Sequence, residues 1–339
     1  MREGGSRRDL LPALLIAAGV LWLLFEIGFV PPRVLAALSI YWPLLLVGVG
    51  LDLLRVRRPW AVPYTALAAI VVVLAALFVP RPDASPPVTA FHEPVGAARS
   101  ASVHLELSSS ASHVFTASDA STLLDAQIRG RPAATFEVRG DRDKTITVRP
   151  QFTRPWVPAS FGTSRWDLAL GPGVPLDLRV DGGSGSTSLD LAGLHLTGFR
   201  LDGGSGAATL TLPGTADRYR ASVQGGSGPA RIDVTAGASL DLSLDMGSGS
   251  TDLVLPPGTD AQVSVRGGSG PIRIDVPTDA AVRLEARNDG SGPLRVASFL
   301  ERQSGSGDIG VWESAAAHGT APAILITVAD AGSGSISIR

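Results

Sequence analysis

The side chains that could do chemistry in this sequence are carboxylates, arginines, serines and a few histidines. The 339-residue chain has no Cys, which excludes disulfides, thiolate metal ligands and thiol nucleophiles. Serine is common, but no G-x-S-x-G elbow lies between a strand and a helix. The five histidines lack the spacing of a metal site; they are His92, His104, His113, His195 and His318. We therefore expect no catalytic residue, no metal ligand and no cofactor, and a protein that is not an enzyme.

Glycine-rich repeats next to acidic residues raise the question of calcium. A calcium-binding β-roll has Asp two positions after the last Gly of G-G-x-G and repeats every nine residues. In this chain those positions hold Thr187, Ala208, Ala230 and Thr251, and the repeat is longer. A phosphate-binding glycine loop needs a following Lys and a helix, which are also missing. Acidic residues outnumber basic residues after residue 80, which is the wrong balance for binding nucleic acid.

The glycines belong to an internal repeat. Six copies of Gly-Ser-Gly follow one another at intervals of 21 or 22 residues. Alternating apolar residues stand on both sides of each copy, as at Leu240, Leu242 and Leu244 before one of them. Two further copies begin at Gly305 and Gly332, out of phase with the six. We assign the glycines of the in-phase copies to the corners of a structural repeat: Gly183, Gly185, Gly204, Gly206, Gly226, Gly228, Gly247, Gly249, Gly268, Gly270, Gly290 and Gly292.

Each repeat unit is predicted to contain a strand, a glycine-rich corner, a second strand and a turn. One such pair cannot bury its own apolar side chains, so neighbouring units must stack. Glycine at the corners is expected to provide positive φ angles and close approach of backbones. The predicted fold class is an all-β stacked-strand repeat domain, β-solenoid-like with about 21–22 residues per unit, preceded by three transmembrane α-helices. A meandering antiparallel sandwich fits the same alternation and is the alternative.

Stacking in register predicts where the outward side chains lie. Asp252 would sit between Arg231 and Arg273 on neighbouring strands, where opposite charges favour that register. Beyond residue 80, the only helical expectation is one short helix at 121–128. The chain ends inside a predicted strand at 335–338 with no capping segment, so we expect a homo-oligomer formed through edge strands.

The N-terminal quarter contains three apolar stretches, at residues 10–30, 34–54 and 60–79. Each has about 20 residues, enough for a helix to cross a hydrocarbon layer of ~30 Å. Arginines gather before the first stretch and between the second and third, which puts the N-terminus in the cytoplasm. Three crossings then place the rest of the chain outside the cell membrane.

These features predict a multi-pass protein of the cell membrane. We expect a membrane domain at 1–80, a Pro-rich linker at 81–100 and an extracytoplasmic β-repeat domain at 101–339. Glu26 and Asp52 lie near the ends of expected helices, where we interpret them as interfacial charges; a proton relay is the alternative.

Four features stand together in the helical part: the run Leu14–Leu24, the Ile27-Gly28 exit, the segment Tyr41-Trp42-Pro43-Leu44-Leu45-Leu46 and the closing Arg55–Arg58. This set resembles the transmembrane module of LiaI- and LiaF-type bacterial envelope-stress proteins. The β-repeat part shows Trp166, Pro175–Val180, Gly182–Gly185, Leu189-Asp190-Leu191, Gly193-Leu194, Phe199–Leu201 and Gly203–Gly206. That set resembles the toastrack-type, candidate-adhesin domain found in the C-terminal part of LiaF-like proteins.

The resemblance implies a non-enzymatic protein of the cell envelope. It would act as a scaffold or as an accessory regulator of envelope-stress sensing, through protein–protein contact. LiaF-like proteins restrain a sensor kinase, so a sensor kinase or another envelope protein is the implied partner. The alternative is a surface adhesin or glycan-binding module that stacks sugars on Trp156, Trp166 or Trp312.

Overall fold

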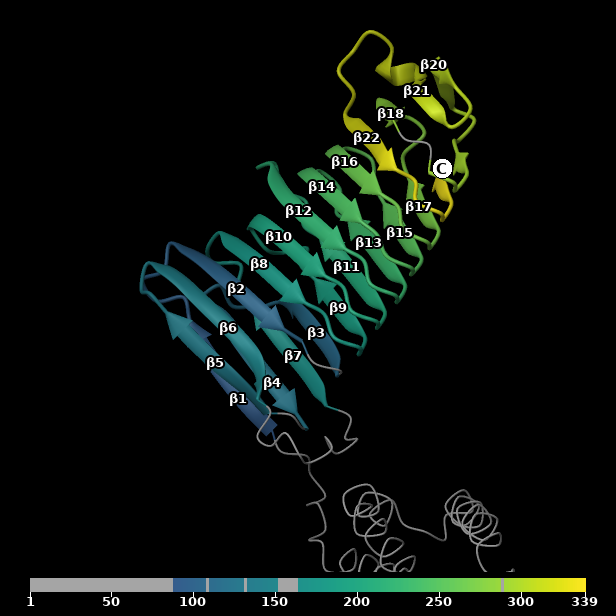
Figure 1. Cartoon of the computed structure of the whole chain (residues 1–339). Helices are drawn as coiled ribbons and strands as arrows, with labels where there is room; N and C mark the ends of the chain where they lie inside the picture. The colour runs from purple at the N-terminus through teal and green to yellow at the C-terminus, as the bar shows by residue number, and fades with distance from the viewer. Residues whose placement is uncertain (1–87, 108–109, 131–132, 152–163, 288–289) are drawn as a thin grey trace, which may run out of the picture. The chain divides into compact units, whose positions relative to one another are not determined.

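The computed structural model describes residues 88–107, 110–130, 133–151, 164–287 and 290–339 of the chain. In this part, the strands form two sheets, with 11 strands in sheet A and 12 in sheet B, and one short 3-10 helix is present, η1 (Ala315–Ala317). Figure 1 shows the strands lying side by side along one axis. None of the described segments forms a helix long and apolar enough to cross a bilayer. The three expected transmembrane helices lie outside the described residues.

The middle of the domain is a regular two-sheet coil. Each unit places the strand before its Gly-Ser-Gly corner in sheet B and the strand after it in sheet A, and strands of successive units pair in parallel. This pairing confirms the stacked-strand fold and is not that of an antiparallel meander. The strands of sheet B are β8 (Leu176–Asp181), β10 (Leu196–Asp202), β12 (Tyr219–Gln224), β14 (Ser239–Asp245) and β16 (Asp260–Arg266). Those of sheet A are β9 (Thr187–Asp190), β11 (Ala208–Leu212), β13 (Ala230–Val234), β15 (Thr251–Val254) and β17 (Ile272–Asp275).

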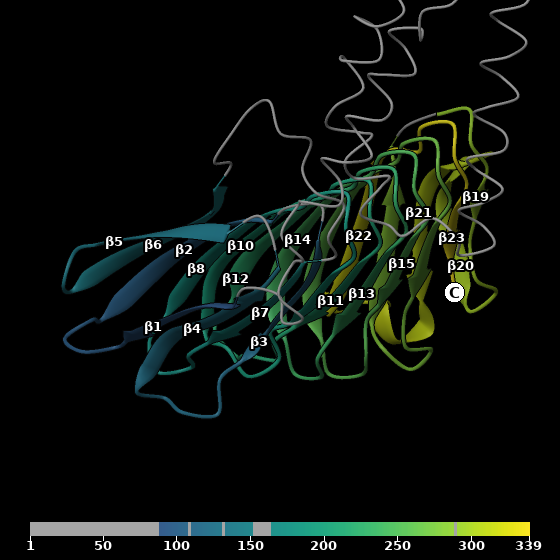
Figure 2. The same ribbon diagram turned by 90° about the horizontal axis from the view of Figure 1, so that it is seen from below.

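The core lies between the two sheets, which face each other in Figure 2. Alternate side chains of every strand point inward, as required by the two-residue period of a strand. In β14 these are Leu240, Leu242 and Leu244, all buried, and the matching positions of the neighbouring strands also hold buried apolar residues. Because most of these residues are aliphatic, each unit adds a thin layer to one continuous core.

The N-terminal end of the stack departs from the simple repeat. β2 (Ser100–Glu106) and β3 (Ala111–Thr116) pair with β8 and β9, while β6 (Asp143–Gln151) and β7 (Arg165–Leu170) form the next coil outward. Antiparallel strands then flank this coil: β4 (Thr122–Arg129) and β1 (Val88–Pro94) in sheet A, and β5 (Ala133–Arg139) in sheet B.

Two expectations are wrong at this end. Residues 121–128 were expected to form at most one short helix, but all of them except Ser121 belong to strand β4, because Leu124, Ala126 and Ile128 alternate with polar residues and are buried. The stretch 81–100, expected to be a linker, contains β1 at Val88–Pro94. The β-domain therefore begins before residue 101.

The C-terminal end contains an inserted coil. After β18 (Val282–Ala286) and β19 (Leu294–Arg295), the chain forms the hairpin of β20 (Leu300–Ser306) and β21 (Ile309–Ser314), then returns through β22 (Ile324–Asp330) and β23 (Ile336–Ile338). β22 lies between β16 and β18, and β23 lies between β17 and β19. The expected C-terminal edge strand is therefore an interior strand.

The burial of the last two strands explains this arrangement. Ile324, Ile326 and Val328 of β22 and Ile336 and Ile338 of β23 are all at most 1% exposed. In sheet A the position beyond β23 is the edge, held by the two-residue strand β19, so the more apolar β23 buries its side chains best in the interior position. The hairpin β20–β21, which is polar on β20, occupies the edge of sheet B.

The corner glycines form a continuous column along the stack, in the spatial order Gly183, Gly204, Gly226, Gly247, Gly268, Gly332 and Gly290. The carbonyl oxygen of Gly226 accepts hydrogen bonds from Ser248 N (3.2 Å) and Gly249 N (3.3 Å) of the next coil. A Cβ on Gly228 would lie 2.0 Å from the oxygen of Gly206. Because that oxygen belongs to the backbone, a larger residue could be accommodated only by separating the coils.

The expected positive φ angles are not found at the in-phase corner glycines. They occur instead at the return turns, where Gly237 and Gly258 both have φ 77. Among the out-of-phase copies, Gly332 (φ 64) joins the column, whereas Gly305 (φ 96) lies in the hairpin β20–β21. Glycine is therefore needed at the corners for its missing Cβ, and at the return turns for its φ angle.

Because the coils approach closely at the corners, adding one methyl group to a corner glycine should strongly reduce the stability of the β-domain. Gly228→Ala should destabilise the β-domain by about 2–3 kcal/mol, because the new Cβ meets a backbone oxygen. The exposed neighbour Ser227→Ala should change stability by less than about 0.5 kcal/mol. Urea unfolding of the full chain in detergent, followed by far-ultraviolet circular dichroism, measures both. Equal midpoints for the two variants would contradict the close-packed column.

Candidate functional site

The outer face of sheet B carries rows of side chains that run along the stack. One row changes from charged to hydroxyl-bearing along its length. In spatial order, it contains His104, Arg179, Arg200, Ser222, Ser243, Ser264 and Thr327. From Arg179 to Ser264, each of these residues lies four positions before a corner glycine. The same register that aligns the corners therefore aligns this row.

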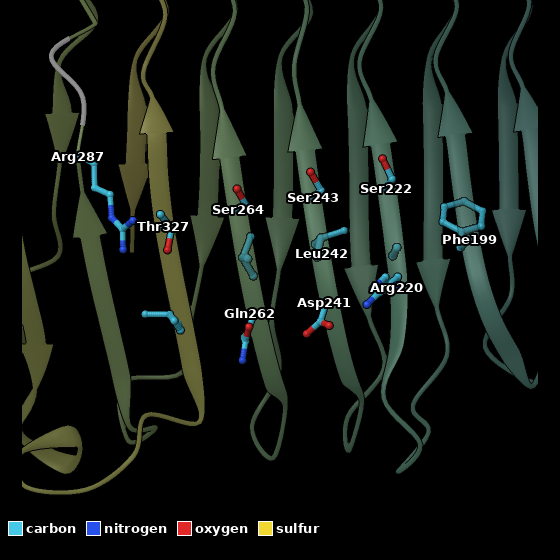
Figure 3. A pocket seen from close by; sticks show the side chains of 13 residues that line it. Phe199, Arg220, Ser222, Asp241, Leu242, Ser243, Gln262, Ser264, Arg287 and Thr327 are labelled. Carbon is cyan, nitrogen blue, oxygen red and sulfur yellow. The ribbon is translucent and has the colours of Figure 1, made fainter.

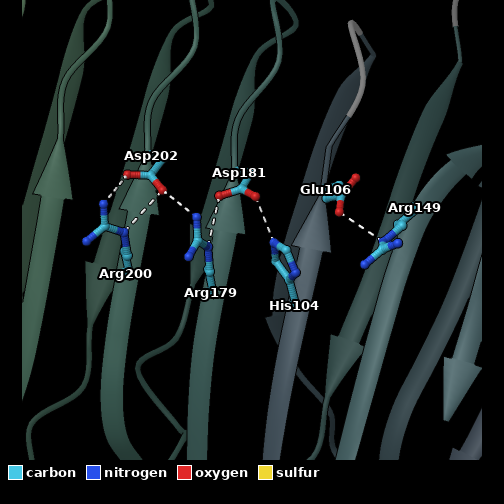
Figure 4. A network of polar contacts seen from close by, with 7 residues as sticks. All are labelled: His104, Glu106, Arg149, Arg179, Asp181, Arg200 and Asp202. Carbon is cyan, nitrogen blue, oxygen red and sulfur yellow. Dashed lines mark hydrogen bonds and ion pairs between the residues drawn. The ribbon is translucent and has the colours of Figure 1, made fainter.

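The charged part of the row is joined to a neighbouring row of acids (Figure 4). Arg200 donates to Asp202 through Nε and Nη2, both at 3.1 Å, and Arg179 bridges from Asp181 to Asp202, with both contacts at 3.2 Å. His104 Nε2 lies 2.7 Å from Asp181 Oδ2. Like charges thus stand side by side along each row, and the opposite charges of the other row compensate them.

Asp181 accepts hydrogen bonds from two side chains, His104 of β2 and Arg179 of its own strand. Its partial burial disfavours the charged form, but hydrogen bonds from His104 and Arg179 outweigh that cost, so the pKa of Asp181 lies below its usual value. The carboxylate is therefore ionised throughout the physiological range and ties β8 to β2.

The hydroxyl part of the row lies in a shallow depression with a volume of about 470 Å³. Figure 3 shows Ser222, Ser243 and Ser264 side by side on consecutive strands, with Thr327 on the next. Arg220, Asp241 and Gln262, the residues two positions earlier, border the depression on one side, and Arg287 stands at its far end. It extends across β12, β14, β16 and β22.

The depression offers hydrogen-bonding groups at a regular spacing. Neighbouring strands lie about 4.8 Å apart, so an extended ligand lying along the stack meets a hydroxyl at each step. Asp241 is held by Arg218, whose Nη1 lies 2.6 Å from Asp241 Oδ1, whereas Arg220 has no ion-pair partner among the described residues. The surface is therefore suited to non-covalent binding of a partner that carries both polar and acidic groups.

The expected charge ladder of sheet A is present in register. Asp252 lies between Arg231 and Arg273 on neighbouring strands, and Arg273 Nη1 donates to its Oδ1 at 3.1 Å. Arg231 instead binds Asp233 of its own strand through Nε (2.9 Å) and Nη2 (2.8 Å), and this hydrogen bond raises the pKa of Arg231. The sequence therefore predicted the register of these strands, but not that Arg231 would bind Asp233 instead of Asp252.

The other candidate site residues that the structure describes lie neither in the depression nor in the charged network. The corner glycines lie in their column at the edges of the sheets and line neither the depression nor the charged network. No group of three His, Asp or Glu side chains in the described part of the chain is arranged to hold a metal ion. Trp166 is 0% exposed and Trp312 is 5% exposed and covered by Arg302, so neither is the sugar-stacking surface that was considered for it. Trp156 lies outside the described residues.

The depression itself was not foreseen, although the sequence contains a signal for it. Ser222, Ser243 and Ser264 all lie at the same position relative to Gly226, Gly247 and Gly268. Comparing outward positions before the corner, in addition to those after it, would have aligned this row.

The network around Asp181 predicts a pH-dependent effect. Because the folded-state pKa of Asp181 is lowered, its contribution to stability is present above the unfolded value of about 3.9 and is lost as pH falls through the folded value. Asp181→Asn should therefore lower the unfolding free energy at pH 7 by roughly 0.5–1 kcal/mol, with a smaller difference at about pH 2.5.

Urea unfolding of the full chain at both pH values measures this effect. Asp245→Asn is the matched control, because Asp245 lies further along the same acidic row and has no ion-pair partner within the described part of the chain. A loss for Asp181→Asn that is the same at both pH values would show that the carboxylate does not act through its charge.

Comparisons with known proteins found one family model and solved structures that are similar to parts of this chain. The family model for the N-terminal domain of toast_rack, DUF2154, matches residues 90–233, from β1 to β13. Two solved structures are similar. A candidate cell adhesion protein from Clostridium sporogenes ATCC 15579 is 14% identical, with 75% of this chain and 98% of that chain covered and a TM-score of 0.36. A candidate adhesin from Bacteroides fragilis NCTC 9343 is 12% identical, with 75% and 97% covered and a TM-score of 0.36.

No curated protein matches this sequence. The LiaI/LiaF-type resemblance concerns residues that precede the described part of the chain.

Proposed function

We propose that this chain is a non-enzymatic, membrane-anchored protein of the cell envelope whose β-domain binds a protein partner through the depression on sheet B. The carrying observation is the row of Ser222, Ser243 and Ser264 in a depression that extends over four strands. A shallow, open and repetitive surface of this kind suits an extended contact rather than the enclosure of a small substrate.

The use of the charged side chains supports a role without catalysis. Catalytic acids and bases stand in clefts where neighbours shift their pKa values towards the working pH. Here Asp181, Arg200 and Arg231 are held in ion pairs on open sheet faces, and their pKa values move away from neutrality. Such pairs fix the register of neighbouring strands and hold the binding surface in shape.

The location is proposed from the sequence. Three apolar stretches at 10–30, 34–54 and 60–79, with arginines on one side, favour a multi-pass anchor with a cytoplasmic N-terminus. The β-domain would then be displayed outside the membrane. The resemblance to LiaF-like proteins favours a role as scaffold or accessory regulator of envelope-stress sensing, with a sensor kinase or another envelope protein as partner.

A glycan-binding or adhesin role is the second candidate. It is favoured by the hydroxyl, amide and guanidinium groups of Ser243, Gln262 and Arg220 in one depression, which are groups that bind sugars through hydrogen bonds. It is weakened by the burial of Trp166 and Trp312, since sugar-binding surfaces gain much of their affinity from exposed aromatic rings.

Filling the depression tests the proposal. Ser243→Arg places a long side chain at its centre and should raise basal envelope-stress transcription in the source cell to the level of a deletion, because partner contact is lost. The matched control is Thr211→Arg, an outward position on β11 of the opposite sheet, between Asp190 and Asp233, which should behave as wild type. Both variants are compared at equal surface amounts, measured with a membrane-impermeant label.

The outcome separates the two candidates. A Ser243→Arg variant with wild-type transcription would contradict partner binding through the depression. If purified full-length protein also sediments with peptidoglycan, and Ser243→Arg but not Thr211→Arg abolishes this, the glycan-binding role would replace the proposed one.

A further inference from the structure

Strand β5 is an edge strand that contains neither a bulge nor a proline. Its seven residues pair with β6 in an uninterrupted antiparallel register, and no other described strand pairs with it. Edge strands expose backbone N–H and C=O groups that can pair with another chain, and proteins normally block them with bulges, proline or charge. Figure 1 shows β5 at the outer limit of the sheet at this end of the stack.

The other edges are blocked. β20, the opposite edge of sheet B, has a register shift between Arg302 and Ser304 and exposes every side chain from Glu301 to Ser306. In sheet A, β1 has a register shift at Glu93/Pro94 and ends in proline, and β19 has only two residues. β5 is therefore the edge best suited to further strand pairing within the described part of the chain.

The side chains of β5 add apolar surface to this edge. Val138 is 36% exposed, although it belongs to the inward-facing row of β5, opposite Ile146 of β6. Phe136 of the same row stacks on Phe91 of β1, with ring centroids 4.4 Å apart and planes at 8°. Both rings are only partly buried, so the core between the two sheets is incompletely covered at this end.

We propose that β5 pairs with β5 of a second copy of this chain. A two-fold axis through Val138 would make an antiparallel pair in which Val138 faces its symmetry mate, and every other residue faces the residue equally far from Val138 on the other side. This register sets Glu137 of one copy opposite Arg139 of the other, twice. Within one copy these two side chains are 46% and 81% exposed and 3.3 Å apart, so both are free to exchange partners across the axis.

This register satisfies both the charged and the apolar side chains of β5. The two Glu–Arg pairs flank a central Val138–Val138 contact, and such cross-strand pairs are those that stabilise antiparallel sheets. Centring the axis on Phe136 instead would set Glu137 opposite Thr135, without charge compensation. This pairing goes beyond the proposed function, because it uses the end of sheet B and leaves the depression open.

Single cysteines provide a direct test, because the natural chain has none. Directly opposed residues of an antiparallel pair have Cα atoms about 4.5–5.5 Å apart, within the range that a disulfide bridges. Val138→Cys in the full chain should therefore form a covalent dimer under mild oxidation. Thr135→Cys in the same strand should form no covalent crosslink, because in this register its symmetry mate lies roughly 20 Å away along the strands.

Charge exchange gives an independent readout. Glu137→Arg should shift the mass of the full chain in detergent from two copies to one, and the double variant Glu137→Arg with Arg139→Glu should restore two copies. Glu301→Arg on the blocked edge β20 is the control and should leave the mass unchanged. A monomeric wild-type chain, or equal crosslinking at residues 135 and 138, would overturn the proposal, whatever the result for the depression.

Discussion

The close approach of successive corners is the constraint on which the rest of the structure depends. The carbonyl oxygen of one corner glycine occupies the space that a side chain would need on the next, and it accepts hydrogen bonds from that coil. Glycine is therefore required at each corner, and the distance and register between coils are set there. Aliphatic side chains can fill the interior in uniform layers only because this spacing is constant.

The outer faces follow from the same register. Residues at equal distance from their corner glycines become neighbours on adjacent strands, so each repeat unit contributes one side chain to every row. On β8 and β10 these positions hold arginines and aspartates, which form ion pairs between the two strands. On β12, β14 and β16 the position four residues before the corner holds a small serine, which leaves a depression. Structural and binding surfaces thus arise from different choices at the same repeat position.

Much of this arrangement could be predicted from the sequence. The strands, the corners and the position of Asp252 between Arg231 and Arg273 all follow from a 21–22-residue period and strand alternation. The prediction of positive φ at the corners was wrong. Glycine is required where a Cβ would clash and also where φ is positive, and the sequence alone does not distinguish these two requirements. β4 was missed because the alternation at Leu124, Ala126 and Ile128 is short and its partner β7 is distant in the chain.

The order of the last coils could not be foreseen, because a repeat period gives the phase of a unit but not its place in the stack. The neighbours of Ser333 test the order of the coils most directly. The hydroxyl of Ser333 lies 3.4 Å from that of Ser269, and the coil that contains Ser291 lies on the other side of Ser333. In the cysteine-free chain, oxidation of Ser269→Cys with Ser333→Cys should give an intramolecular disulfide, and Ser269→Cys with Ser291→Cys should not. The reverse result would place the units in chain order and contradict the glycine column described above.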